Sequence, residues 1–358
     1  MPIPRFAWNS SDEKPKPASN YDIKYGYGLI KRESSNWPNY NIITTPSAFN
    51  TARKLLATKP VGSANVSLLD WNYLDQIEHD LPNSELFVGI GGGMALDASK
   101  YIALKRGVPL IIIPSIVSSG AIIHGHVAKW EKRHIVGTDL DWPWIDFDDI
   151  LVDYDLVLEA PDRLNSAGLG DVLCGFASIS EWKHNASTGK CPPCDNKMIN
   201  RTLDHHNYIV DEFPKTLCND QSLSDKSIKF IMSAIQDRDE LSVRDPAAPS
   251  ADHSLWLAIE EINSKSYIHG EIVALSAAII AWHCGESPSV LPKWLDICQI
   301  NWRPRSAGIS KIELQRGLEF IPSYLYNKIS INDTPSILST DPIIGKTFNN
   351  LWNFLEEC

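Results

Sequence analysis

The chain has 358 residues, which corresponds to two domains of usual size, and its 43% hydrophobic and 22% charged content excludes disordered, collagen-like and coiled-coil proteins. Its net charge of −11 argues against nucleic acid and anionic membranes as partners, because both require a concentrated positive field, whereas a small anionic or phosphorylated substrate stays compatible. The seven cysteines are odd in number and lack a repeated spacing, so we expect no disulfide framework and a reducing, cytoplasmic location.

The first half of the chain predicts an α/β domain. Residues 1–20, rich in Pro, Ser, Lys and Asp, form a loose extension without the apolar stretch of a signal peptide. Over residues 21–160 short apolar runs alternate with helical patterns, which predicts a parallel sheet with right-handed crossovers. The runs predict strands at 40–45, 64–70, 85–90 and 109–114, and helices at 47–57 and from the glycines at 91–93 through 103.

The second half, residues 161–358, predicts an all-helical domain, because the periodicity changes to 3.6 residues and strand signals almost disappear. We place the boundary near Ala160-Pro161. The longest apolar runs, 108–117 and 272–284, fall short of the roughly 20 residues of a membrane helix. The first predicts a buried strand and the second a buried helix.

A glycine-rich turn is the most informative segment of the first half. Gly91, Gly92 and Gly93 follow a predicted buried strand and precede a helix. Uncovered backbone N–H groups at the positive end of a helix suit a pyrophosphate. A tight strand–helix turn that requires glycine is the alternative interpretation. Asp97 and Lys100, one turn apart on the helix, form an ion pair of an ordinary kind by themselves.

The helical half contains a carboxylate and two imidazoles at wide spacing. Asp171 follows Gly168-Leu-Gly170, and His253 and His269 come far downstream. This donor set suits Zn²⁺ or Fe²⁺ and leaves coordination positions for a substrate. Each residue alone also has an ordinary structural explanation, so the prediction depends on a fold that brings them together.

The ordered set of motifs is similar to that of a known superfamily. Gly-Gly-Gly-x-x-x-Asp-x-x-Lys at 91–100 is followed by Gly-x-Gly-Asp at 168–171, Asp-His at 252–253 and His-Gly-Glu at 269–271. This order resembles the dehydroquinate synthase-like superfamily, which includes the iron-containing alcohol dehydrogenases, and is most similar to glycerol-1-phosphate dehydrogenases. Residues 170–183 and 244–253 also resemble glycerol-1-phosphate dehydrogenase motifs.

The resemblance implies an α/β nucleotide-binding domain, an all-α metal-binding domain and an active site in the cleft between them. It implies NAD or NADP as cofactor and one divalent metal, Zn or Fe, held by Asp171, His253 and His269. Cofactor contacts would come from the following residues: Gly91, Gly92, Gly93, Asp97, Ser115, Ser118 and Ser119. The aspartate at 171, where cyclases of the superfamily have glutamate, favours a dehydrogenase.

Two departures from the family pattern affect the substrate. Leu257 stands where the family has a second histidine, and Gly120 replaces an acid that faces the substrate. His124 and His126, two residues apart on a predicted strand, are candidates to replace the lost acid–base groups together with Lys100. A solvent-exposed strand edge is the alternative interpretation of the two histidines.

The sequence thus predicts a metal-dependent, NAD(P)-linked oxidoreductase that transfers hydride between nicotinamide and an alcohol, a polyol or the corresponding carbonyl compound. We expect an altered small-molecule substrate relative to glycerol-1-phosphate dehydrogenases. The alternatives are a sugar-phosphate cyclase or lyase that uses NAD catalytically, and a nucleotide-binding pseudoenzyme. The strand end Thr44-Thr45 lacks the acid that would bind the ribose 2′-hydroxyl of NAD, so NADP is also compatible with the sequence. The sequence is equally compatible with a homo-oligomer.

Overall fold

The structure is a computed structural model that describes residues 23–125, 127–131, 134–138, 148–241, 251–285, 287–328 and 335–357. It divides into two compact units: a sheet unit, which contains the residues up to Asn165 and Ser222–Met232, and a helical unit, which contains Ser166–Gln221 and the residues from Ser233 onward. The division falls inside helix α6 (Asp162–Leu173) rather than at the expected Ala160-Pro161. The predicted loose extension over residues 1–20 lies outside the described residues.

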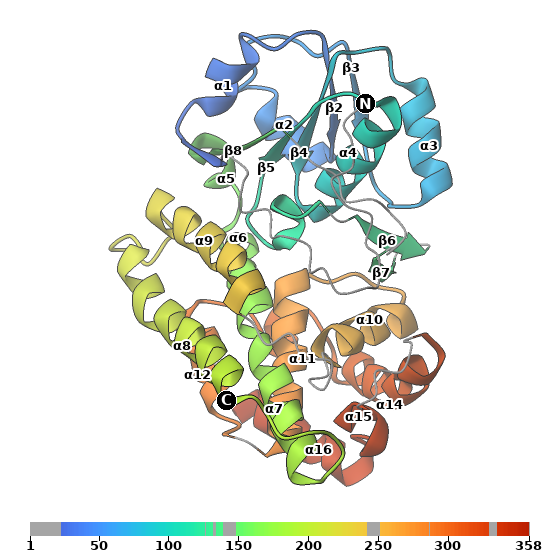
Figure 1. Ribbon diagram of the computed structural model, residues 1–358, viewed down its shortest axis with the longest axis vertical. Coiled ribbons are helices and arrows are strands. Elements are labelled where there is room, and N and C mark those ends of the chain that lie inside the picture. Colours follow the sequence, from blue (N-terminus) through green and yellow to red (C-terminus); the bar gives the residue numbers. More distant parts are fainter. Residues whose placement is uncertain are drawn as a thin grey trace. The chain divides into compact units, whose positions relative to one another are not determined.

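The sheet unit contains a six-stranded sheet in the order β1-β8-β5-β4-β2-β3, and every pair of neighbouring strands is parallel (Figure 1). All residues of β2, β4 and β5 are buried, as is typical of a parallel sheet with both faces covered. The strands are β1 (Ile23–Gly26), β2 (Tyr40–Thr44), β3 (Gly62–Asn65), β4 (Leu86–Gly91), β5 (Leu110–Pro114) and β8 (Asp149–Asp153).

Short helices connect these strands, and α4 packs on β4, β2 and β5. The strands β6 and β7, which follow β5 in the chain, form a separate two-stranded antiparallel sheet. The elements are α1 (Leu29–Ser34), α2 (Pro46–Ala52), α3 (Trp71–Asp80), α4 (Gly93–Arg106), the 3₁₀ helix η1 (Gly120–Ile122), β6 (Ala128–Glu131), β7 (His134–Thr138) and α5 (Tyr154–Val157).

The predicted strands at 40–45, 85–90 and 109–114 are confirmed, but the strand predicted at 64–70 is wrong beyond Asn65. Its last residue, Asp70, instead caps α3, because its side chain accepts a hydrogen bond of 3.1 Å from the Tyr73 N–H. The sequence prediction also missed β1 and β8. β1 is only half-buried, so it lacks the apolar run that indicates a strand.

The described part of the helical unit contains helices and no strand. None of the described helices has the combination of length and hydropathy that a membrane span requires. The helices from α6 onward are α7 (Gly175–Ser187), α8 (Asn196–Glu212), η2 (Phe213–Thr216), α9 (Asp225–Leu241), α10 (Ala251–Asn263), α11 (His269–Cys284), α12 (Val290–Ile297), α13 (Pro304–Ala307), α14 (Lys311–Lys328), α15 (Ile337–Thr340) and α16 (Gly345–Glu357).

Helix α11 is the core of the helical unit and matches the predicted buried helix: every residue from Gly270 to Ala281 is buried. It meets α6 at two glycines. A Cβ atom on Gly270 would lie 1.7 Å from the Ala167 carbonyl oxygen, and one on Gly170 would lie 2.3 Å from the Gly270 carbonyl oxygen. The two helix backbones therefore touch at a point that only glycine permits.

We expect Gly270→Ala to force α6 and α11 apart, since the added methyl group meets backbone that cannot rotate away. The free energy of unfolding should fall by about 2 kcal/mol or more, measured as a lower thermal midpoint. Gly175→Ala is the control, because a Cβ atom there meets its nearest neighbour at an ordinary 3.5 Å. Equal midpoints for the two variants would contradict the close contact.

Candidate metal centre and nucleotide pocket

Asp171 lies in the last turn of α6 and is 2% exposed. Its Oδ2 atom pairs with Nη1 of Arg238, on α9, at 2.5 Å. Its Oδ1 atom has no hydrogen-bond partner among the described residues. A buried carboxylate oxygen requires compensation, and here two imidazole nitrogens approach it.

The two predicted histidine ligands converge on this oxygen from two other helices. Nε2 of His253, on α10, and Nε2 of His269, the first residue of α11, each lie 3.3 Å from Asp171 Oδ1. The side chains are 36% and 27% exposed, respectively, so a route to solvent exists. The structure thus brings together all three residues of the predicted metal site.

Neighbouring side chains orient the two imidazoles. Oδ2 of Asp252, which is 1% exposed, lies 2.7 Å from His253 Nδ1. With a metal ion bound, a proton on Nδ1 would leave the Nε2 lone pair available to the ion, as in carboxylate–histidine–metal arrangements. The Trp256 ring packs edge-on against His269, with centroids 4.3 Å apart. Asp252 and Trp256 therefore act as positioning residues.

The electrostatics of this cluster favour charged groups despite burial. Burial raises the pKa of Asp171, but Arg238 and then His269 outweigh it and hold the pKa of this carboxyl well below its usual range. Burial lowers the pKa of His253, yet the Asp252 and Asp171 carboxylates raise it to about 10. Without a metal, His253 is therefore a positively charged imidazolium at neutral pH, with a proton on each ring nitrogen.

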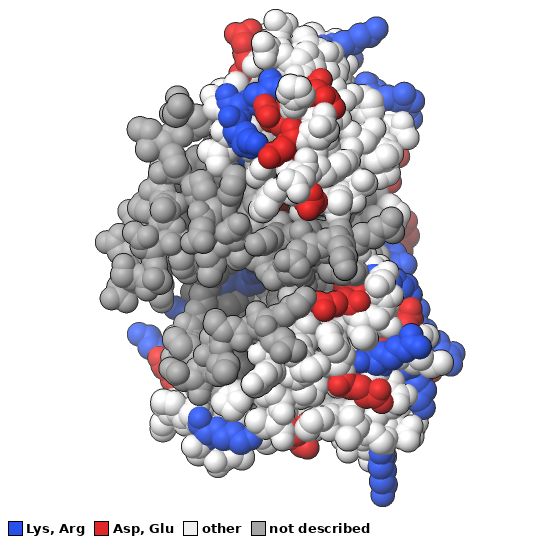
Figure 2. Space-filling view, turned by 90° about the vertical axis from the view of Figure 1, so that its right-hand side faces the viewer, with Lys and Arg blue, Asp and Glu red and all other residues white. Residues whose placement is uncertain are grey.

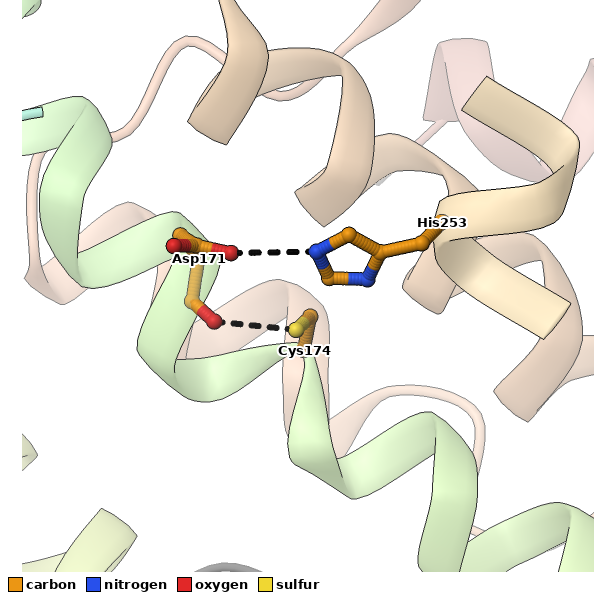
Figure 3. Close-up of side chains that lie close together, drawn as sticks. All are labelled: Asp171, Cys174 and His253. Atoms are coloured by element: carbon orange, nitrogen blue, oxygen red, sulfur yellow. Dashed lines mark hydrogen bonds and ion pairs between the residues drawn. The ribbon is translucent and has the colours of Figure 1, made fainter. Parts of the chain in front are cut away.

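These residues fit a divalent metal ion. One carboxylate oxygen lies 3.3 Å from each of two imidazole nitrogens, which is the kind of donor set that Zn²⁺ and Fe²⁺ accept. Cys174 adds a sulfur beside Asp171 and His253 (Figure 3). The sequence interpretation missed Arg238 and Cys174. Only the Asp171-x-x-Cys174 spacing within one helical turn was a visible signal, and nothing in the sequence indicates Arg238.

The sheet unit contains a pocket of about 410 Å³ at the carboxyl ends of β2, β4 and β5, where parallel sheets bind nucleotides. Gly92, Gly93 and Ser115, three of the predicted cofactor residues, line it. Residues that the sequence interpretation did not single out also line it: Thr45, Ser47, Thr51 and Glu159 among the polar ones, and Ala48, Ile116 and Leu164 among the apolar ones.

The glycine turn leaves the beginning of α4 open. Gly92 is the N-cap of α4 and offers no side chain to its first N–H groups. A Cβ atom on Gly91 would lie 2.6 Å from Ala95 Cβ, whereas one on Gly92 would lie 3.0 Å from Ile116 Cδ1, the tip of a flexible side chain. Gly91 is thus required for packing, and Gly92 leaves backbone that an anion can approach.

Asp97 and Lys100 are buried and tie three segments of the sheet unit together. Lys100 Nζ pairs with Asp97 Oδ1 at 2.9 Å and donates a 2.6 Å hydrogen bond to the Ala121 carbonyl oxygen. Asp97 Oδ2 accepts a hydrogen bond from the Ala128 N–H. Because the Lys100 side chain has no exposed surface, this placement favours a structural part over the predicted catalytic one.

The loop that follows β5 departs from the sequence prediction. His124 does not lie on a strand: the backbone turns at η1, and the His124 N–H donates to the Gly120 carbonyl oxygen at 2.9 Å. His126 lies outside the described residues. Ser118 and Ser119 are half-buried and are not among the residues that line the nucleotide pocket.

Comparisons with known proteins show what the chain is similar to as a whole. The sequence profile of the family described as iron-containing alcohol dehydrogenase matches residues 50–161. The glycerol-1-phosphate dehydrogenase (NAD(P)+) of Methanococcus aeolicus is 26% identical over 230 residues, which cover 59% of this chain and 63% of that protein. The enzyme of that name from Methanococcus vannielii is 26% identical over 280 residues, which cover 71% and 75%.

Solved structures share the fold at lower identity. Glycerol dehydrogenase from Schizosaccharomyces pombe aligns with a TM-score of 0.65 and 17% identity over 94% of this chain and 89% of its own. A probable glycerol dehydrogenase from Sinorhizobium meliloti aligns with a TM-score of 0.64 and 15% identity over 94% and 97%. The expected fold class, an α/β domain with an all-α domain, is confirmed, and the fold is shared with glycerol dehydrogenases.

The resemblance recognised from the motifs is confirmed as a similarity: residues 50–161 match the iron-containing alcohol dehydrogenase family, and longer stretches are similar in sequence to glycerol-1-phosphate dehydrogenases. The names of these relatives agree with the expectation of an NAD(P)-linked enzyme. The individual site residues stay predictions, which the geometry above supports to different degrees.

We expect metal binding by the metal-free protein to strengthen as the pH rises. The His253 proton, held by a pKa of about 10, must leave before Nε2 can coordinate. The apparent affinity for Zn²⁺ should therefore rise at least about tenfold per pH unit between roughly pH 6 and 8. Calorimetry in two buffers of different ionisation enthalpy measures the released protons.

His253→Ala and His269→Ala should each lower the bound metal, measured by elemental analysis, while circular dichroism stays unchanged. Full metal occupancy in both variants would exclude the site. An affinity that stays level with pH in the wild-type protein would contradict the protonated state of His253.

Proposed function

We propose that this protein is a metal-dependent NAD(P)-linked oxidoreductase that transfers hydride between nicotinamide and an alcohol, a polyol or the corresponding carbonyl compound. The observation that carries the proposal is the convergence of His253 and His269 on the unpartnered Asp171 oxygen. The glycine-lined pocket at the carboxyl ends of the strands supports the nucleotide half of the reaction.

In this proposal the sheet unit holds the cofactor. The N–H groups at the beginning of α4 bind the pyrophosphate, and the Ser115 hydroxyl lines the same pocket. The buried Asp97–Lys100 pair holds the loop after β5 against α4, which keeps the pocket in shape before the cofactor binds. Both NAD and NADP are candidates, since Thr45 rather than an acid follows the end of β2.

The helical unit would hold one divalent ion, Zn²⁺ or Fe²⁺, on Asp171, His253 and His269. When bound, such an ion supplies Lewis-acid stabilisation of an alcohol or carbonyl oxygen. Arg238 holds one oxygen of Asp171, which leaves the other for the ligand position. Asp252 holds the Nδ1 proton of His253, so the ring keeps its orientation and its Nε2 lone pair.

We propose a small-molecule substrate that is phosphorylated or otherwise anionic at one group, because such a ligand needs only a local basic pocket and no extended positive surface. Figure 2 shows Lys and Arg interspersed with Asp and Glu over the described part of one face. Leu257, one turn after His253 on α10, is half-buried where the resemblance implies a histidine. An apolar side chain there favours a less hydroxylated substrate than glycerol 1-phosphate.

Two other functions are separated from this one by the stoichiometry of the cofactor. A dehydrogenase changes one NAD(P)H for each substrate turned over, a cyclase or lyase turns over with catalytic NAD, and a pseudoenzyme binds nucleotide without turnover. A panel of aldehydes, ketones and polyols, followed by absorbance of NAD(P)H with the Zn²⁺- or Fe²⁺-loaded protein, is the experiment that tests the proposal.

We expect Gly92→Val to weaken nucleotide binding at least about tenfold, because a branched side chain covers backbone that must meet phosphate. Calorimetric titration with NAD(H) and NADP(H) measures this. The added Cβ atom would also approach Ile116 Cδ1, so Gly92→Val/Ile116→Ala is the matched control. Binding that recovers in the double variant, or never falls in the single one, would mean that the turn is merely structural.

We expect slow turnover of dihydroxyacetone phosphate relative to some other aldehyde or ketone, since Leu257 and Gly120 leave substrate polar groups unpaired at about 1–3 kcal/mol each. Steady-state NAD(P)H oxidation compares the substrates. Leu257→His should raise the activity with polyols, and Leu257→Met serves as the size-matched control. Turnover of dihydroxyacetone phosphate by the wild-type protein at a typical enzyme rate of about 10 per second would contradict this prediction.

A further inference from the structure

A cysteine that the resemblance assigns no part lies inside the candidate metal centre. Cys174 is the residue between α6 and α7, and it is 6% exposed. One atom each of Asp171, Cys174 and His253, namely a carboxylate oxygen, the sulfur and a ring nitrogen, lie within 4.8 Å of one another (Figure 3). The position of Cys174 one residue past the end of α6 brings its sulfur to the Asp171 carbonyl oxygen, at 2.9 Å.

A second observation, on the Asp171 carboxylate, supports a metal ion as the ligand of these three side chains. Asp171 is 2% exposed, and its Oδ1 atom has no hydrogen-bond partner among the described residues. In a tetrahedral site with bonds of about 2.0–2.3 Å, the ligand atoms lie about 3.3–3.8 Å apart. The three atoms lie within 4.8 Å of one another, about 1 Å beyond the spacing of ligands around one ion.

We propose that the Cys174 thiolate is an additional ligand of the divalent ion, together with Asp171, His253 and His269. This inference rests on the metal centre of the proposed function and deepens it. Cys174 Sγ now donates to the Asp171 carbonyl oxygen at 2.9 Å. On coordination the thiol releases its proton to solvent, and a sulfur lone pair forms the bond to the ion.

The consequence is a preference among metals. A thiolate is a soft donor that favours Zn²⁺ and Co²⁺ over the hard ions Mg²⁺ and Mn²⁺, and it adds negative charge that stabilises Zn²⁺ relative to Fe²⁺. With Asp171, Cys174, His253 and His269 as ligands, a zinc ion would still accept a substrate oxygen, because zinc can take a fifth ligand. The centre should accordingly purify with zinc even when iron is supplied.

The test is the absorption spectrum of the Co²⁺-substituted protein. Thiolate ligation produces a sulfur-to-cobalt charge-transfer band in the near ultraviolet, apart from the visible bands that any bound Co²⁺ produces. We expect both in the wild-type protein. Cys174→Ala and Cys174→Ser should keep the visible bands, lose the near-ultraviolet band, and bind Zn²⁺ about tenfold more weakly or worse.

Two control variants separate Cys174 from the other cysteines. Cys298 is also buried but is not part of any described group of metal-ligating side chains, so Cys298→Ser should leave the spectrum unchanged. Cys191 and Cys194 are partly exposed and close in sequence, so Cys191→Ser/Cys194→Ser must also keep the near-ultraviolet band. A band that disappears in the latter variant instead of in Cys174→Ala would overturn the inference.

The spectrum also distinguishes the failure of this inference from the failure of the metal centre. Visible cobalt bands without a charge-transfer band in the wild-type protein would exclude Cys174 as a ligand and leave Asp171, His253 and His269 in place. No bound cobalt at any pH would exclude the metal centre and the cysteine together. Neither result depends on a variant that folds or on enzymatic activity.

Discussion

The metal centre depends on the contact between the backbones of α6 and α11. Gly170 and Gly270 lie at this contact, and any Cβ atom at either position would overlap a carbonyl group of the other helix. The residues beside these glycines are Asp171 and His269, so the backbone contact itself sets the distance between a carboxylate and an imidazole. A ligand pair held in this way needs no long side chain, and it keeps its geometry because two packed helices move little.

Electrostatic balance around Asp171 explains why the same cluster is stable without a metal. A buried carboxylate requires compensation, and Arg238 together with protonated His253 provides it. A divalent ion would replace the proton on His253 with greater charge at the same place. Asp252 keeps the imidazole oriented in both states. A proton on His253 therefore competes with the metal ion for the same nitrogen, so the metal affinity depends on pH.

The sheet unit shows how a motif can combine binding with structure. Of the three glycines in the turn, Gly91 is needed for packing against Ala95, whereas Gly92 and Gly93 line the pocket. Asp97 and Lys100, which belong to the same motif, are buried and hold Ala121 and Ala128. A motif position can thus serve the cofactor indirectly, through the loop that it holds in place.

The sequence alone determined the strands with continuous apolar runs, the buried helix over the apolar run 272–284 and the position of the glycine turn, because each has a local pattern. It also predicted Asp171, His253 and His269 as one group, which the structure brings together. It could not determine β1, which is half-buried, or the turn at His124, which depends on the hydrogen bonds of η1. The position of Arg238 beside Asp171 became visible only in the tertiary structure, and for Cys174 the sequence held no more than its spacing from Asp171. Arg238 reaches Asp171 because α9 lies beside α6 in the fold. A contact between side chains far apart in the sequence leaves no periodic pattern in that sequence.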